Sequence, residues 1–120
     1  MNKRFRLKKS SDFQRVRRFG KAIAHPFVVL VFLPNDLDQV RVGVAAGKSI
    51  GNAVQRNRAK RILRAAIQPH LSKVKSGNDC VLIAREPILN TNAAQLSQVL
   101  NELLRKARLI SDENEHPPKE

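Results

Sequence analysis

The chain has 120 residues, 42% of them hydrophobic, so one domain with an ordinary buried core is expected. Its net charge is +13, of which residues 111–120 carry −3 and residues 1–110 therefore carry +16. This excess favours a polyanionic partner, and the lack of a long apolar run argues against a membrane-spanning segment or a membrane partner.

The first nine residues are rich in lysine and arginine and predict an extended basic arm. Ser11 and Gln14 have the spacing of a capping box, so a short helix is expected to begin at Ser11 and to end at Gly20. Phe13 in this helix has two interpretations. Its ring either belongs to the core or lies at the edge of a cleft, where it stacks on a base.

β-branched and apolar segments predict four strands, over residues 21–24, 27–33, 41–46 and 80–84. The second strand is apolar on both faces, which consist of residues 27, 29, 31 and 33 and of residues 28, 30 and 32. Both faces should therefore be covered. Helices are expected on one face, and the other is a candidate floor for a ligand cleft. Cys80, the only cysteine, is interpreted as a buried hydrophobic residue in a protein of the reducing cytoplasm.

The most informative stretch, residues 48–68, reads KSIGNAVQRNRAKRILRAAIQ. Ser49 and Asn52 can cap a helix start, and apolar residues at 59, 62, 63, 66 and 67 form one helical stripe. Five cations lie within nine residues without an acid between them: Arg56, Arg58, Lys60, Arg61 and Arg64. Since like charges on one helix face repel, this pattern favours a nucleic-acid partner over a merely solvated basic helix. Asn57 adds a donor and an acceptor for a base edge or a ribose hydroxyl.

The C-terminal part predicts a helix after Asn92 with a leucine-rich stripe, followed by a tail. The complete order is α-β-β-β-α-β-α, which indicates an α+β fold: a single two-layer domain with a small sheet packed with helices. Residues 1–110 are expected to form the RNA-binding domain and residues 111–120 a disordered acidic tail.

No arrangement of residues is typical of catalysis or of a metal site. His25, His70 and His116 are isolated and are interpreted as surface or loop residues. The Gly47-Lys48-Ser49 triplet lacks the earlier glycine of a phosphate-binding loop. A stand-alone nuclease is therefore disfavoured, and so is a DNA regulator, because no helix-turn-helix spacing surrounds the basic helix.

Three segments resemble the bacterial ribonuclease P protein component: residues 41–44 (RVGV), 48–54 (KSIGNAV) and 56–64 (RNRAKRILR). The Arg56-Asn57-Arg58 triplet matches the RNR hallmark of that family. Weaker similarity at residues 6–7, 12–13, 20 and 83–85 extends the resemblance over residues 4–108. The chain departs from the family pattern at Arg17 and Leu30, where some relatives have aromatic residues, and at Ser49 and Glu86, where basic residues are usual.

The resemblance implies a non-catalytic protein subunit in an enzyme whose catalytic RNA, with bound Mg²⁺, hydrolyses one phosphodiester bond to remove the 5′ leader of precursor tRNA. It implies a monomer in a 1:1 ribonucleoprotein and a left-handed β-α-β crossover in place of the right-handed default. The residues implied to contact the catalytic RNA are Lys48, Arg56, Asn57, Arg58, Lys60, Arg61 and Arg64. The residues implied to line a leader cleft between the first helix and the sheet are Phe13, Arg17, Val28, Leu30 and Arg85. The alternative is a ribosomal or general RNA-binding protein without a role in tRNA processing.

Overall fold

The elements follow the predicted order. They are α1 (Ser10–Phe19), β1 (Lys21–Ala24), β2 (Val28–Pro34), β3 (Val40–Ala45), α2 (Ala53–Ile67), β4 (Asn78–Ala84) and α3 (Ala93–Lys106). The computed structural model describes residues 3–111, so the predicted acidic tail lies outside the described residues except for Ser111. Short 3₁₀ turns occur at Lys3–Phe5, Lys48–Ile50, Gln68–Lys73 and Glu86–Asn90.

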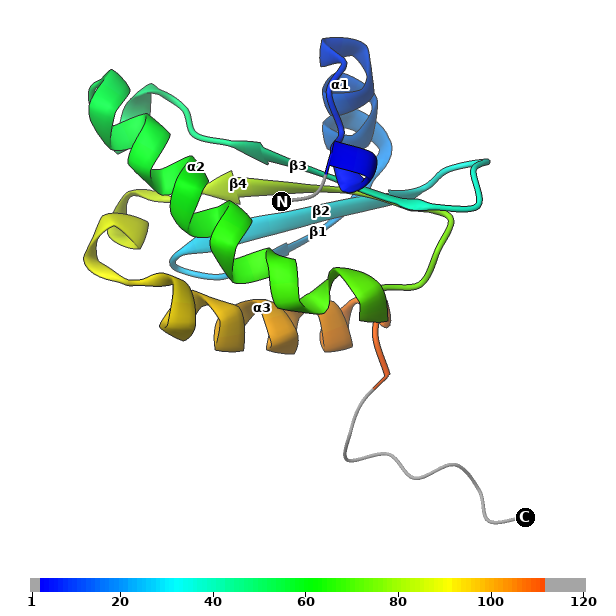
Figure 1. Cartoon of the computed structure of the whole chain (residues 1–120). Coiled ribbons are helices and arrows are strands. Elements are labelled where there is room, and N and C mark those ends of the chain that lie inside the picture. Colours follow the sequence, from blue (N-terminus) through cyan, green and yellow to red (C-terminus); the bar gives the residue numbers. More distant parts are fainter. Residues whose placement is uncertain (1–2, 112–120) are drawn as a thin grey trace.

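The four strands form one sheet in the order β1-β2-β4-β3. β2 pairs antiparallel with β1 and β4, whereas β3 and β4 are parallel and joined through α2. In Figure 1 the β3 and β4 arrows both point left, β3 lies above β4, and α2 crosses in front of them. This connection is left-handed, as the resemblance implies and against the usual preference.

α2 and α3 cover one face of the sheet, and α1 lies on the other (Figure 1). The larger core lies between the sheet and the two long helices and includes Leu30, Leu63 and Leu100. The smaller cluster lies under α1 and includes Val16 and Val81. The two faces of β2 are therefore both buried at least in part, as its apolar pattern predicts.

The N-terminal arm is not simply extended. Its described part, residues 3–9, includes the 3₁₀ turn Lys3–Phe5, and Arg6 then forms a parallel bridge with Val42 of β3. The amide of Leu7 donates to the Val42 carbonyl at 3.0 Å, and the Leu7 side chain is buried. The arm thus covers the outer edge of β3, which would otherwise present unpaired backbone groups.

The N-terminal ends of α1 and α2 differ in how they are capped. Asn52 Oδ1 accepts from the Gln55 amide, and Gln55 Oε1 accepts from the Asn52 amide, both at 2.9 Å, which completes a capping box for α2. The capping box predicted from Ser11 is wrong, because α1 begins at Ser10 and its cap residue, Lys9, makes no side-chain cap bond. Contacts with the sheet hold α1 in place, as tertiary packing commonly does for short helices.

Candidate nucleic-acid interface

α2 separates an apolar face from a cationic one. Its buried residues are Ala59, Leu63, Ala66 and Ile67. The side chains predicted to bind RNA lie elsewhere on the helix: Asn57, Arg58 and Arg61 are exposed, and Arg56, Lys60 and Arg64 are partly buried. Lys48 is exposed in the turn before α2. The structure therefore brings the seven residues onto one element and the turn that precedes it.

The cations of α2 have no carboxylate partner within residues 3–111. Every salt bridge in this part of the chain joins Arg15 or Arg41 to Asp12 or Asp79. Arg56 instead donates from Nη1 to the Gly51 carbonyl at 2.9 Å. The positive charge of α2 is therefore not compensated internally, so an anionic partner would be attracted to it.

The N-terminal arm continues this cationic surface. Arg64 is partly buried, its Nε has no hydrogen-bond partner, and burial lowers the pKa of its guanidinium. The positive charge of Arg6 lowers this pKa further, which places the two arginines near each other. An anion between them would relieve both the desolvation and the repulsion. Sequence reasoning did not select Arg6 as a site residue, since only the fold brings the arm beside α2.

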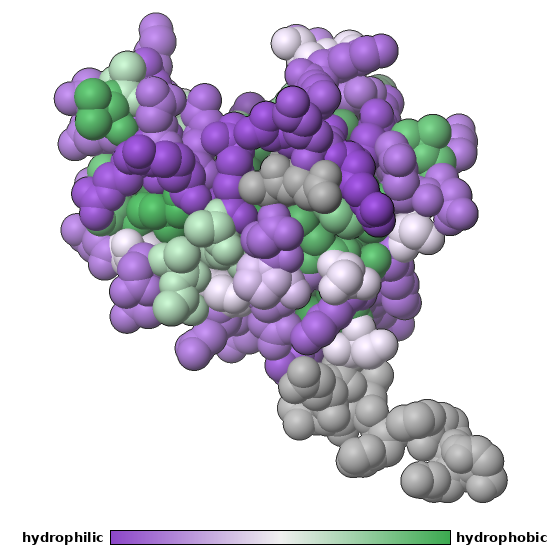
Figure 2. Space-filling model, in the orientation of Figure 1, coloured by the Kyte–Doolittle hydropathy of each residue, from purple (hydrophilic) through white to green (hydrophobic). Residues whose placement is uncertain are grey.

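On the opposite side, α1 covers only part of the sheet. The Phe13 ring packs so closely on β3 that a Cβ at Gly43 would lie 2.3 Å from its Cζ. Val29 and Ile83 belong to the cluster under α1 but remain partly exposed. Arg17 is exposed one helical turn after Phe13. Figure 2 shows a notch between the part of the surface that carries α1 and the part that carries the start of α2.

Val28 and Leu30 do not belong to this surface, so this part of the predicted cleft is wrong. Both side chains have 0% exposure and lie in the core with α2 and α3. Successive strand residues point to opposite faces, so the α1 side receives Val29 and Val31. The alternation in the sequence defines the two faces of β2, but it does not tell which of them meets α1.

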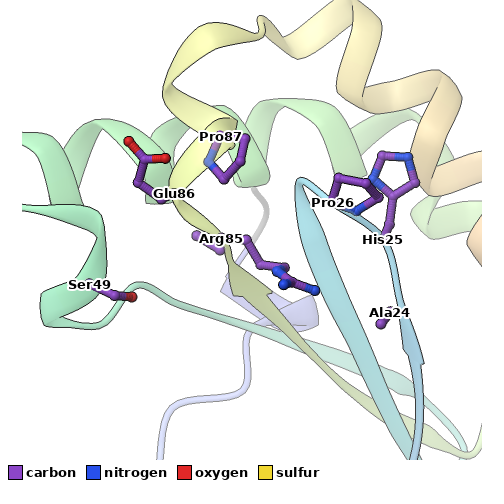
Figure 3. A pocket seen from close by; sticks show the side chains of 8 residues that line it. Ala24, His25, Pro26, Ser49, Arg85, Glu86 and Pro87 are labelled. Atoms are coloured by element: carbon purple, nitrogen blue, oxygen red, sulfur yellow. The ribbon is translucent and has the colours of Figure 1, made fainter.

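Arg85 follows directly after β4 and is exposed. By strand alternation it falls on the same side as Ile83. It lines an open cavity of about 540 Å³, together with Ala24 and Ser49. Figure 3 shows the Arg85 side chain extending toward the β1–β2 hairpin, whereas Glu86 is directed away from it. We call Phe13, Arg17, Val29, Ile83 and Arg85 the α1-side surface.

A buried carboxylate holds α1 against the sheet. Asp79 of β4 has 0% exposure and accepts hydrogen bonds from Arg15 of α1, from Arg41 of β3 and from Asn35. Burial alone would raise the pKa of Asp79, but the bonds from Arg41, Asn35 and Arg15 outweigh it and lower this pKa. The ionised carboxylate thus ties α1 to two strands, and this fixes one border of the α1-side surface.

Two further predictions concern histidine and metals. His70 lies in the connection between α2 and β4, but it is buried and its Nε2 lies 2.8 Å from Ser97 Oγ, so a surface position is wrong for it. Within residues 3–111, no group of three or more His, Cys, Asp or Glu side chains is arranged to hold a metal ion. In the same part of the chain, no helix has the length and apolar character needed to cross a membrane.

Comparison with known proteins gives a consistent result. The family model described as Ribonuclease P matches residues 1–108. The chain is 36% identical to the ribonuclease P protein component of Listeria innocua over 111 residues, which cover 92% of this chain and 93% of the relative. It is 35% identical to the ribonuclease P protein component of Staphylococcus epidermidis over 112 residues, which cover 92% of this chain and 96% of the relative. The solved structure of the Staphylococcus aureus RNase P protein has a TM-score of 0.78 at 32% identity, over 89% of this chain and 98% of that one.

Proposed function

Because the chain belongs to the bacterial ribonuclease P protein family, we propose that α2 binds the RNA subunit of ribonuclease P and that the α1-side surface binds the 5′ leader of precursor tRNA. The protein is the non-catalytic subunit of this endoribonuclease. Its RNA partner follows from the family. The residues, the leader contacts and a 1:1 complex with a monomeric protein in the cytoplasm belong to the proposal.

One observation carries the assignment of α2: its cations have no carboxylate partner within residues 3–111. Lysine and arginine side chains that neutralise the phosphates of an RNA release the cations condensed along it, and this release favours binding. The helix is rigid, because it is capped by Asn52 and buries its apolar stripe. The residues proposed to contact the RNA subunit are Lys48, Arg56, Asn57, Arg58, Lys60, Arg61 and Arg64.

The α1-side surface suits a single strand of RNA without strong sequence preference. Phe13, Val29 and Ile83 offer partly exposed apolar contacts for bases. Arg17 and Arg85 are exposed cations on its borders that can contact phosphates. The Asp79 network holds α1 at a fixed position, so this surface is formed before the leader binds.

The protein contributes to hydrolysis through binding. Mg²⁺ held by the RNA subunit would activate the attacking water and stabilise the charge of the transition state. Cations of this chain that neutralise nearby phosphates would reduce the Mg²⁺ concentration needed for the same rate. That the protein itself holds no metal stays a prediction.

The test is a double substitution of two exposed cations of α2, Arg58→Gln with Arg61→Gln. Exposed ion pairs contribute up to about 1 kcal/mol each, so we expect roughly tenfold weaker binding to the RNA subunit. Leader removal at low Mg²⁺ should fall in parallel. The matched control is Lys73→Gln with Lys106→Gln, which removes the same charge from exposed positions outside the proposed surfaces. Equal loss in the two double variants would contradict the assignment of α2.

A further inference from the structure

A separate pocket lies where the end of α1, the β1–β2 pair and the end of α3 meet. It encloses about 320 Å³, at the small end of the range for ligand sites. Phe19, Leu33 and Leu109 contribute apolar walls, and none of the described residues that line it is acidic. Three cations also line it, namely Lys21, Lys75 and Arg108. We call it the Phe19 pocket.

Phe19 is an aromatic residue that folding leaves uncovered, with 64% of its surface exposed. The end of α1 lies directly on β2, because a Cβ at Gly20 would lie 2.7 Å from the Phe32 carbonyl oxygen. This contact brings the end of α1 to the pocket, which Phe19 lines. The guanidinium of Arg18 lies over the ring, 5.4 Å from its centroid. Exposed aromatic rings stack on nucleic-acid bases, and an arginine over such a ring adds a cation–π contribution.

Arg108 occupies a backbone position that favours glycine. Its φ is +61°, and it follows Ala107, the C-cap of α3. The next amide, of Leu109, donates back to the Leu104 carbonyl at 2.9 Å, which closes the helix end. Helices commonly end with glycine at this point, since a Cβ is disfavoured there. Relative to glycine, arginine costs backbone free energy at this position, although its charge is favourable near a helix C-terminus.

The other cations are brought to the pocket by specific contacts. The Lys75 amide donates to the Leu109 carbonyl at 2.8 Å, which brings the segment before β4 beside the end of α3. Lys21 begins β1, directly after Gly20, the C-cap of α1. Three separate parts of the chain thus direct positive charge toward one apolar pocket.

We propose that the Phe19 pocket binds one nucleotide of single-stranded RNA, with the base against Phe19 and Leu33 and the phosphate near Lys21, Lys75 and Arg108. This inference rests on the proposed function only in that RNA is the partner; the pocket is distinct from α2 and the α1-side surface. The acidic residues that follow Ser111 in the sequence, such as Asp112 and Glu113, could also attract these cations. Their carboxylates offer no flat ring to stack on Phe19, so a nucleotide fits both features better.

The experiment titrates the full chain with a four-nucleotide oligoadenylate and follows the backbone amide signals of Lys75 and Leu109 by NMR. The informative variant is Arg108→Gly. Glycine relieves the positive φ, so the midpoint of urea unfolding should rise, while the affinity measured at these two amides should fall about fivefold or more. Phe19→Ala should weaken the same affinity at least fivefold through lost stacking. An unchanged affinity in either variant would overturn the proposal.

Two further variants separate the alternatives. In Arg58→Gln with Arg61→Gln, the amide shifts at the Phe19 pocket should persist with unchanged affinity, even if binding to the RNA subunit is lost. Loss of these shifts in that variant would show that the pocket has no affinity of its own. In a full-length chain with Asp112→Asn, Glu113→Gln and Glu115→Gln, the two amides should stay unshifted before RNA is added. A shift there would identify the acidic tail as the occupant instead.

Discussion

At the scale of single residues, Gly43 sets how closely α1 approaches the sheet. A Cβ at this position would lie 2.3 Å from the Phe13 ring. Gly43→Ala should therefore displace the ring and lower the free energy of unfolding by about 1–3 kcal/mol, measured by urea denaturation. Gly47→Ala is the matched control, since nothing lies within 4 Å of its added Cβ. It should change stability by less than about 0.5 kcal/mol. If both variants lost a similar amount of stability, the position of the Phe13 ring would not depend on the absence of a Cβ at Gly43.

His70 makes stability depend on pH. Burial lowers the pKa of its imidazole, and the bond to the Ser97 carbonyl offsets this only in part. The unfolded chain therefore binds a proton more readily than the folded one, so stability should decrease as the pH falls below about 6.5. The slope is at most about 1.4 kcal/mol per pH unit. His70→Gln should flatten it between about pH 7 and pH 5 in urea unfolding curves. An unchanged slope would assign the pH dependence to other groups.

Residues whose surroundings come from distant segments were the ones that sequence reasoning missed. His70 is buried because α3 supplies Ser97, and Asp79 is ionised because α1 and β3 supply Arg15 and Arg41. No local pattern signals either contact. Cys80, by contrast, lies in an apolar run and is buried as predicted, and burial raises the pKa of its thiol to about 12.

At the scale of elements, the register of β2 decides which side chains can meet the leader. Val29→Ala should weaken binding of leader-containing precursor tRNA to the holoenzyme several-fold, because an apolar contact on the α1-side surface is lost. Binding of tRNA without a leader should not change. Fluorescence titration of both tRNAs measures the difference.

The matched control for this prediction is the neighbouring residue. Val28 points into the core with 0% exposure, so Val28→Ala should lower the free energy of unfolding by about 1–3 kcal/mol and leave discrimination between the two tRNAs intact. If Val28→Ala, and not Val29→Ala, abolished the discrimination between the two tRNAs, the leader would contact the face of β2 that carries Val28, as the resemblance implies.

Elements with a strong local signal were predictable. The apolar stripe and the Asn52 cap define α2, and alternating apolar residues define β2. The short α1 was predicted close to its observed bounds but with the wrong cap, since its position depends on Asp79 and on Phe13 rather than on its own first turn. Strength of local pattern thus separates the elements that sequence alone defines from those that packing defines.

At the scale of the whole molecule, the arrangement of charge follows from the topology. The left-handed β3–α2–β4 connection places α2 along one side of the sheet, and the N-terminal arm pairs with the edge of β3 nearby (Figure 1). Arg6 thereby joins the cations of α2, near Arg64. Neither the handedness nor this pairing follows from composition or periodicity. The handedness was expected from the family resemblance, and the pairing of the arm with β3 was not predicted.

The most direct measurement is the affinity of the full chain for the RNA subunit as a function of salt concentration. If the cations of α2 contact three or more phosphates, the logarithm of the association constant should fall with the logarithm of salt concentration with a slope of about −2 or steeper. Arg58→Gln with Arg61→Gln should reduce this slope by about 1.5, as expected for two lost phosphate contacts. The account would be contradicted if the slope for the unsubstituted chain corresponded to fewer than about three phosphate contacts. It would also be contradicted if the double variant had the same slope as the unsubstituted chain.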